Sequence, residues 1–277
     1  MSRGKIVSAD EAIAIIHDRD VLATTGYGGN GTPEHLLLAL ERRFLDSGTP
    51  RELTLVHSTG QGDAREKGLN HLAHEGLLKR VVGGYYGLTP AIGKLVNANK
   101  IEAYNFPEGA ILQLYRAIAA GKPGTLSKVG LGTYVDPRQD GGKLNEATTE
   151  ELVELLEFDG KEWLFFKAFP VNVVFLRGTT ADPDGNITME RESLFLEDLA
   201  LAMAAKNSGG YVICQVERIA EAGSLKSKEV RIPGILVDCV VVAEQDHHMQ
   251  NFGTRYNPAF SGEIRVPVQS LDPLPLN

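Results

Sequence analysis

Short apolar segments alternate with helix-start signals in this chain, and that alternation restricts its fold more than any other feature. Residues 21–25, 53–56, 80–83 and 101–104 read as strands. Three of them are followed by a proline that suits the first turn of a helix, namely Pro33, Pro90 and Pro107. Alternation with short connections predicts an α/β fold, a mostly parallel sheet flanked by helices, with its ligand site beyond the carboxyl ends of the strands.

The strand–helix rhythm breaks after residue 124 and resumes near residue 171. Residues 124–142 are rich in glycine and proline, and residues 146–157 are acidic with leucines at helical spacing, which predicts a loop followed by an exposed helix or excursion. Further strands are predicted at 171–176, 211–216 and 235–242, with a helix at 193–206.

The chain is expected to form one domain with a tail. We assign residues 1–256 to the α/β domain and residues 257–277, which contain four prolines, to an extended tail or linker.

Composition limits the classes of partner. The net charge of −8 opposes a broad nucleic-acid surface or an anionic membrane surface. No apolar stretch approaches the ~20 residues of a membrane span, and the polar N-terminus carries no secretory signal. The two cysteines lie in separate apolar runs without a CxxC pair, which disfavours a zinc site and fits a cytoplasmic protein. His247 and His248 are adjacent, so they point in different directions; we expect solvated histidines and no metal site.

A glycine-rich turn follows the first predicted strand. Its residues, Gly26, Tyr27, Gly28, Gly29, Asn30 and Gly31, match G-x-G-x-x-G, the pattern that binds dinucleotides between a strand and a helix. However, the next strand ends in Leu55-Val56-His57, without the acidic residue that would bind a ribose. The pattern therefore favours a tight turn that lets another molecule approach the backbone closely over a nicotinamide site.

Several motifs in order resemble those of class I coenzyme A transferases. Residues 25–34 resemble the family's first signature, a Gly-Gly-Phe followed by Gly-x-Pro-Glu, and residues 104–109 resemble its Pro-Gln-Gly site. Residues 128–133 resemble its Gly-x-Gly-Thr loop, and residues 182–186 match a further turn. The resemblance extends over the whole chain and is strongest to the N-terminal, α-type half of propionate and acetate coenzyme A transferases. It implies the NagB/RpiA/CoA transferase-like fold.

The resemblance also implies an activity and a partner. Family enzymes exchange coenzyme A between a short-chain acyl thioester and a free carboxylate, through a glutamyl-CoA intermediate. The nucleophilic glutamate belongs to the β-type half, and no matching glutamate is found here. We therefore expect an α-type half, inactive without its β-type half and part of an oligomer. A coenzyme A thioester is its substrate, and no permanently bound cofactor is expected.

Four side chains are candidates for the carboxylate and oxyanion pocket. Glu108 stands where the family has the glutamine of Pro-Gln-Gly; an ionised glutamate accepts hydrogen bonds but cannot donate one, so only a protonated Glu108 would replace that donor. Alternatively, Glu108 is a helix-start carboxylate. Ser58 and Thr59 follow a strand and are either substrate-facing hydroxyls or loop caps. Gln61 either reaches the pocket or serves the turn. The glycine-rich turn is expected to face the substrate.

Two other functions remain open. On the same scaffold, an acid such as Glu108 would activate water in a coenzyme A thioester hydrolase or a ring-opening enzyme. A non-catalytic ligand-binding module is the second alternative, since this fold also serves sugar-phosphate isomerases and regulators.

Overall fold

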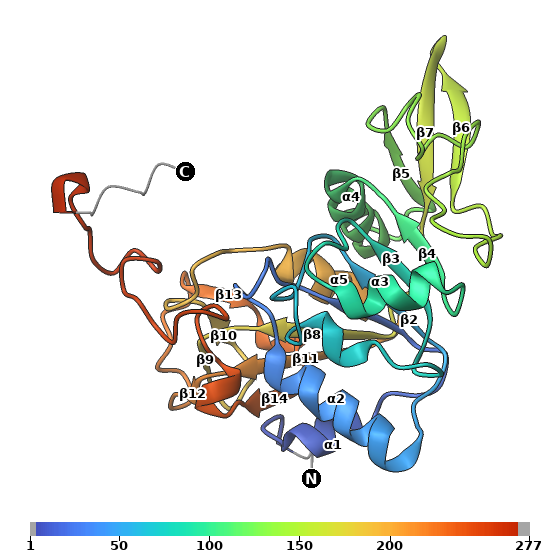
Figure 1. The fold of residues 1–277 in the computed structure, drawn as a ribbon. Helices are drawn as coiled ribbons and strands as arrows, with labels where there is room; N and C mark the ends of the chain where they lie inside the picture. The colour runs from blue at the N-terminus through green and yellow to red at the C-terminus, as the bar shows by residue number, and fades with distance from the viewer. Residues whose placement is uncertain (1–3, 271–277) are drawn as a thin grey trace.

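A seven-stranded parallel sheet forms the centre of the protein (Figure 1), which a computed structural model describes from residue 4 to residue 270. The strand order is β14-β11-β8-β1-β2-β3-β4. The chain builds outward from β1 to β4 and then crosses to β8 on the other side of β1, which places a topological switch point at β1 and β8. The strands are β1 (Val21–Thr24), β2 (Leu53–His57), β3 (Leu78–Gly83), β4 (Glu102–Asn105), β8 (Val173–Arg177), β11 (Tyr211–Val216) and β14 (Cys239–Val242).

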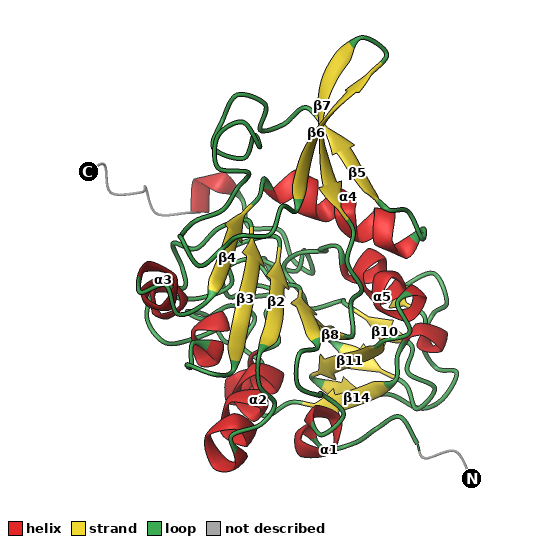
Figure 2. Ribbon diagram, turned by 90° about the vertical axis from the view of Figure 1, so that its right-hand side faces the viewer, coloured by secondary structure: helices red, strands yellow, loops and turns green. Residues whose placement is uncertain are grey.

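Helices cover both faces of this sheet, as the sequence predicts (Figure 2). One apolar core lies under α1 (Ala9–Ile13), α2 (Glu34–Ser47) and α3 (Pro90–Asn97), and a second lies under α4 (Glu108–Ala119) and α5 (Asp198–Asn207). Successive strand residues alternate between the cores, because neighbouring side chains of a strand point to opposite faces; Leu22 belongs to the first core and Ala23 to the second. The α/β prediction is confirmed.

Helix starts follow local chemistry. The Ser8 hydroxyl accepts a hydrogen bond from the Glu11 amide while the Glu11 carboxylate accepts one from the Ser8 amide, the capping box that the sequence predicts. Pro90 begins α3 at the predicted place, whereas α5 begins at Asp198, five residues later than expected. Short 3-10 turns complete the helical elements: η1 (Leu69–Leu72), η2 (Gly234–Leu236), η3 (Gln245–His247) and η4 (Val268–Ser270).

Two small sheets are added to the central one. A four-stranded sheet, with order β12-β9-β10-β13, continues from the carboxyl ends of β8 and β11, since β9 follows β8 and β12 follows β11 along the chain. A three-stranded antiparallel sheet, β5-β7-β6, projects from the body of the molecule near α4 (Figure 1). The strands are β9 (Thr180–Ala181), β10 (Ile187–Thr188), β12 (Arg218–Ile219), β13 (Val230–Ile232), β5 (Gly124–Ser127), β6 (Val153–Phe158) and β7 (Lys161–Lys167).

Two secondary-structure expectations need correction. Of the two alternatives for the acidic segment 146–157, the helix is absent from the described structure, because Val153–Phe158 forms strand β6 and pairs antiparallel with β7. The expected strand 235–242 begins only at Cys239, since Gly234–Leu236 forms η2. The excursion that the same acidic segment suggested is present as the projecting sheet.

The predicted tail, 257–277, is described as far as Ser270 and carries mostly half-exposed or exposed residues; positions 271–277 lie outside the described part. Within residues 4–270, no helix has both the length and the apolar character needed to cross a bilayer.

Candidate functional site

A small pocket opens at the carboxyl edge of β1 and β2, beside the switch point of the sheet. Its volume is about 150 Å³. The loops after β1 and β2 form one wall, the first two turns of α4 a second, and the segment before α5 a third. The lining residues are Thr25, Gly26, Ser58, Thr59, Glu108, Leu112, Tyr115, Phe195, Leu196 and Glu197. We call this cavity the edge pocket.

Gly26 lines the edge pocket in a conformation that only glycine adopts easily. Its φ is +144°, and a Cβ there would lie 2.4 Å from the Thr32 hydroxyl oxygen. The Thr59 hydroxyl donates a hydrogen bond to the Gly26 carbonyl, and the Gly28 amide donates to the Gly60 carbonyl at 2.7 Å. The turn after β1 is thereby tied to the turn after β2.

The rest of the glycine-rich turn lies outside the edge pocket and supports it. Tyr27 and Asn30 exchange two backbone hydrogen bonds, and the Ser193 hydroxyl bonds the Asn30 side chain at 2.8 Å. Gly29 packs against Phe252 so closely that a Cβ would lie 2.4 Å from its backbone nitrogen. Of the six turn residues, only Gly26 lines the pocket.

The predicted polar residues after β2 divide into two groups. Ser58 and Thr59 line the edge pocket, and the Ser58 hydroxyl has no hydrogen-bond partner among the described residues. Gln61 does not line it: its buried amide accepts from the Thr24 hydroxyl at 2.8 Å and donates to the Thr24 carbonyl at 3.1 Å. Gln61 therefore stabilises the turn and does not reach the pocket, which is the second of the two roles proposed for it.

His57 holds the backbone of Ser58 and Thr59 in place. It is fully buried, and burial lowers its pKa to about 4, so the ring is neutral at pH 7. Its Nδ1 lies 2.7 Å from the Thr59 carbonyl oxygen; because a carbonyl only accepts, Nδ1 carries the proton.

Glu108 stands at the mouth of the edge pocket as the first residue of α4. Its side chain is exposed and has no partner within residues 4–270. A second carboxylate of the lining, Glu197, is paired with Arg116 at 2.7 Å. Glu108 is thus the lining carboxylate whose charge no cation offsets, and it combines both predicted roles, a pocket position and a helix start.

The apolar wall of the edge pocket was not predicted from the sequence. Leu112 and Tyr115 follow Glu108 by four and seven residues, which puts all three on one face of α4; this spacing is the signal that was available. Phe195 and Leu196 close the opposite side. The pocket thus combines hydroxyl and carboxylate groups with apolar walls, the mixed lining that is typical of small-molecule sites.

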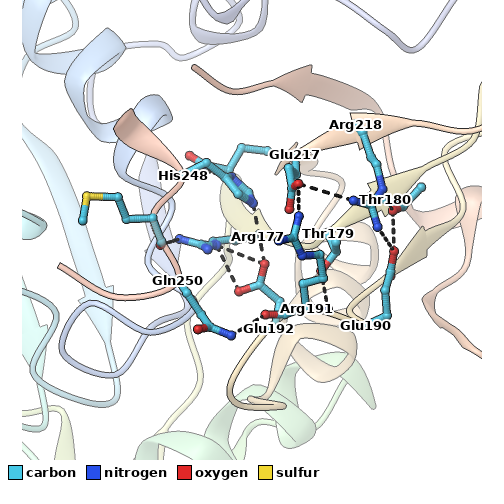
Figure 3. Close-up of polar contacts among 12 residues, drawn as sticks. Arg177, Thr179, Thr180, Glu190, Arg191, Glu192, Glu217, Arg218, His248 and Gln250 are labelled. Carbon is cyan, nitrogen blue, oxygen red and sulfur yellow. Dashed lines mark hydrogen bonds and ion pairs between the residues drawn. The ribbon is translucent and has the colours of Figure 1, made fainter. Parts of the chain in front are cut away.

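A buried ion-pair cluster lies at the carboxyl end of β8, across the switch point from β1 and β2. Figure 3 shows its polar contacts. Arg177 at the end of β8 pairs with Glu192 at 3.1 Å and donates to the Met249 carbonyl at 2.8 Å. Burial opposes ionisation of Glu192, but Arg177 and His248 outweigh it and lower the pKa of Glu192 to about 2. A cavity of about 260 Å³ adjoins the cluster.

His248 belongs to this cluster, so the expectation of two solvated histidines is wrong for His248. Its ring is buried and lies 3.6 Å from the Glu192 carboxylate. The Gln215 side-chain oxygen accepts a hydrogen bond from the His35 amide at the start of α2, and the Gln215 NH₂ group donates one to His248 Nδ1 at 2.9 Å. In the described part of the chain, no three His, Cys, Asp or Glu side chains gather as a metal site would require.

Comparison with known proteins identifies relatives. The family model described as coenzyme A transferase matches residues 6–243. The caffeate CoA-transferase of Acetobacterium woodii is 47% identical over 273 residues, which is 98% of this chain and 52% of that protein. The acetate CoA-transferase subunit alpha of Escherichia coli (strain K12) is 26% identical over 242 residues, covering 87% of this chain and 98% of the subunit.

A solved structure has the same fold. The crystal structure of the acyl-CoA transferase YdiF from Escherichia coli O157:H7, in a thioester complex with CoA, matches with a TM-score of 0.92 and 43% identity. The match covers 98% of this chain and 52% of that one. The chain therefore spans about half the length of YdiF and of the caffeate CoA-transferase.

Proposed function

Since the chain belongs to the coenzyme A transferase family, we propose that it is the α-type half of an enzyme that exchanges coenzyme A between a short-chain acyl-CoA and a free carboxylate. Acids of the acetate and propionate class are the proposed substrates. The nucleophilic glutamate is supplied by a β-type half, and the activity requires both. Residues 1–256 form the domain, and residues 257–277 lead toward that half.

The edge pocket carries this proposal. It brings Gly26, Ser58, Thr59 and Glu108 from three separate segments to the carboxyl edge of the central strands. The relatives support the two-half organisation, because one resembles this chain along 98% of its length and is named a subunit alpha. The thioester complex of YdiF supports a covalent path for the coenzyme A group.

The proposed reaction proceeds in balanced steps. The glutamate carboxylate of the β-type half attacks the acyl carbonyl, and the coenzyme A thiolate leaves, which gives a mixed anhydride. The thiolate then attacks the glutamyl carbonyl and releases the first carboxylate, leaving a glutamyl-CoA thioester. A second carboxylate reverses the sequence and leaves as the new acyl-CoA, so no oxidant or metal is consumed.

This chain supplies the surroundings for those steps. The Ser58 hydroxyl can donate a hydrogen bond to the oxyanion that develops on the acyl carbonyl. Leu112, Phe195 and Leu196 hold the acyl chain and exclude water from the anhydride. Tyr27 and Phe195 are 55% and 61% exposed on loops at the same edge, and they form part of the surface on which the β-type half closes.

Substitution of Glu108 tests this proposal. Its unpaired carboxylate at the mouth repels a carboxylate substrate, whereas glutamine, the residue at this position in the family motif, can donate. In the chain combined with a β-type half, E108Q should lower the KM for propionate about tenfold, measured as propionyl-CoA formed from acetyl-CoA. E197Q is the matched control and should change KM less, because Arg116 already offsets Glu197. Equal KM values for E108Q and wild type would show that Glu108 does not face the substrate.

The exposed, unpartnered Glu108 also favours a second candidate, a coenzyme A thioester hydrolase in which this carboxylate takes a proton from water. The same assay separates the two. Loss of acetyl-CoA without propionyl-CoA, abolished by E108Q, would favour the hydrolase and contradict transfer.

A further inference from the structure

A second cavity shares one wall with the edge pocket. Two residues, Phe195 and Leu196, line both cavities. The second cavity has a volume of about 250 Å³. Its other lining residues are Met189, Asp198, Leu199, Val230 and Arg231. Because Val230 and Arg231 belong to strand β13, we call it the β13 cavity. The side chains of Phe195 and Leu196 therefore stand between the two cavities.

Side-chain contacts hold this shared wall in place. The guanidinium carbon of Arg231 lies 4.0 Å from the centre of the Phe195 ring, which is a cation–π contact. The Leu196 side chain packs against Gly31, where a Cβ would lie 3.0 Å from Cδ1 of the leucine. Within residues 4–270, no amide of residues 193–196 donates to a backbone carbonyl. A substitution in the wall therefore changes its side chains without breaking a hydrogen-bonded ladder.

The wall limits the space that an acyl chain can occupy. The edge pocket alone has a volume of about 150 Å³, below the ~300–1,000 Å³ of pockets that enclose drug-sized ligands. An acyl carbonyl at the Ser58 hydroxyl directs a longer chain across the pocket toward Phe195 and Leu196, which close the opposite side. Beyond these two side chains, the mostly apolar lining of the β13 cavity continues the path.

We propose that Phe195 and Leu196 determine acyl-chain length, because they separate the edge pocket from the β13 cavity and so exclude acids longer than the short-chain class. The inference rests on the proposed function, since it takes the edge pocket as the acyl site. Leu196 is the half-buried member of the pair, whereas Phe195 is 61% exposed. Truncation of Leu196 should therefore open the longer path more fully, and each methylene group that enters should raise affinity about fourfold.

Binding of propionate and octanoate to the 277-residue chain tests this without requiring turnover. In ligand-observed NMR titrations, L196A should bind octanoate at least about tenfold more tightly than wild type does, and F195A should change in the same direction. L112A is the matched control, because Leu112 lines the edge pocket but not the β13 cavity. It loses the same side-chain atoms as L196A and should not gain affinity for octanoate.

A substitution in the β13 cavity locates the bound chain. Val230 lines that cavity and not the edge pocket, so the double variant L196A/V230F fills the added space. It should lose the gain for octanoate and keep the binding of propionate. In the chain combined with a β-type half, the kcat/KM ratio of octanoate to propionate should follow the same order among the variants. Thermal unfolding establishes that each variant is folded, and F195A replaces L196A in the test if L196A is not.

Three results would overturn the inference: no gain for octanoate in either wall variant, an equal gain in L112A, or a gain that V230F leaves unchanged. In each of these cases, binding of propionate by wild type would still support the proposed function. If wild type binds neither acid, the proposed function fails and the inference fails with it.

Discussion

The buried carboxyl group of Asp198 destabilises the folded state by an amount that depends on pH. Asp198 is the first residue of α5, and its carboxylate accepts from the Leu196 amide at 3.2 Å. Burial raises its pKa to about 6, an effect that the nearby Thr25 hydroxyl partly opposes and that the Glu192 carboxylate reinforces. At neutral pH the folded protein therefore holds a charge that its interior disfavours.

The size of this destabilisation follows from the linkage between proton binding and folding. A rise from the ordinary value of 3.8 to about 6 is roughly two pKa units, each worth 1.36 kcal/mol, so the ionised carboxylate costs about 3 kcal/mol of folding free energy above pH 7. Because the folded-state pKa is the higher one, the folded state binds more protons between these values and stability falls as pH rises. The cost is about 1 kcal/mol at pH 4.5.

The Asp198→Asn variant removes this charge and keeps a carbonyl oxygen for the Leu196 amide. Urea unfolding should show that its advantage over wild type grows by about 2 kcal/mol between pH 4.5 and pH 8. Asp159→Asn, at an exposed turn, controls for the loss of one negative charge. A difference between D198N and wild type that stays constant with pH, or shrinks toward pH 8, would refute the reasoning.

Two further substitutions test the frame of the site. E192Q leaves the buried Arg177 charge without its carboxylate and should lower the free energy of unfolding at pH 7 by about 3 kcal/mol. Because the folded-state pKa of Glu192 is depressed, wild type should lose a similar amount as the pH falls from about 4.5 toward 2. Urea titrations that show no such loss in either case would contradict this reasoning. G26A forces a Cβ against Thr32 at a positive φ and should cost about 2 kcal/mol and abolish binding of carboxylates, read by unfolding and by NMR titration; unaltered binding would show that the turn tolerates a side chain.

The sequence predicts the central fold because its signals are local. Most strands of the central sheet are short apolar runs, and helices α1 to α4 each start at a side-chain cap or a proline, so these elements could be assigned without knowing their neighbours. The projecting hairpin shows where one local signal overrode another. Leucine spacing in residues 146–157 favoured a helix, yet Asp159-Gly160 is a strong two-residue hairpin signal, and both residues have positive φ between β6 and β7.

The candidate site was predictable only in part. Ser58, Thr59 and Glu108 follow strands in the sequence, so the edge of the sheet brings them together. Phe195 and Leu196 come from a segment that has no strand or helix, and nothing local indicates that it folds over the pocket. The partners of His248, which include Glu192 and Gln215, depend on long-range packing that one sequence does not reveal.

Intact-mass measurement tests the two-half account most directly. The purified chain is incubated with acetyl-CoA and propionate, alone and with a β-type half, while propionyl-CoA is followed in parallel. The account predicts no exchange and no mass change for the chain alone, then exchange with a coenzyme A adduct on the β-type half when the two are combined. An adduct on this chain, or exchange without a partner, would contradict it, because the nucleophile would then lie within these 277 residues.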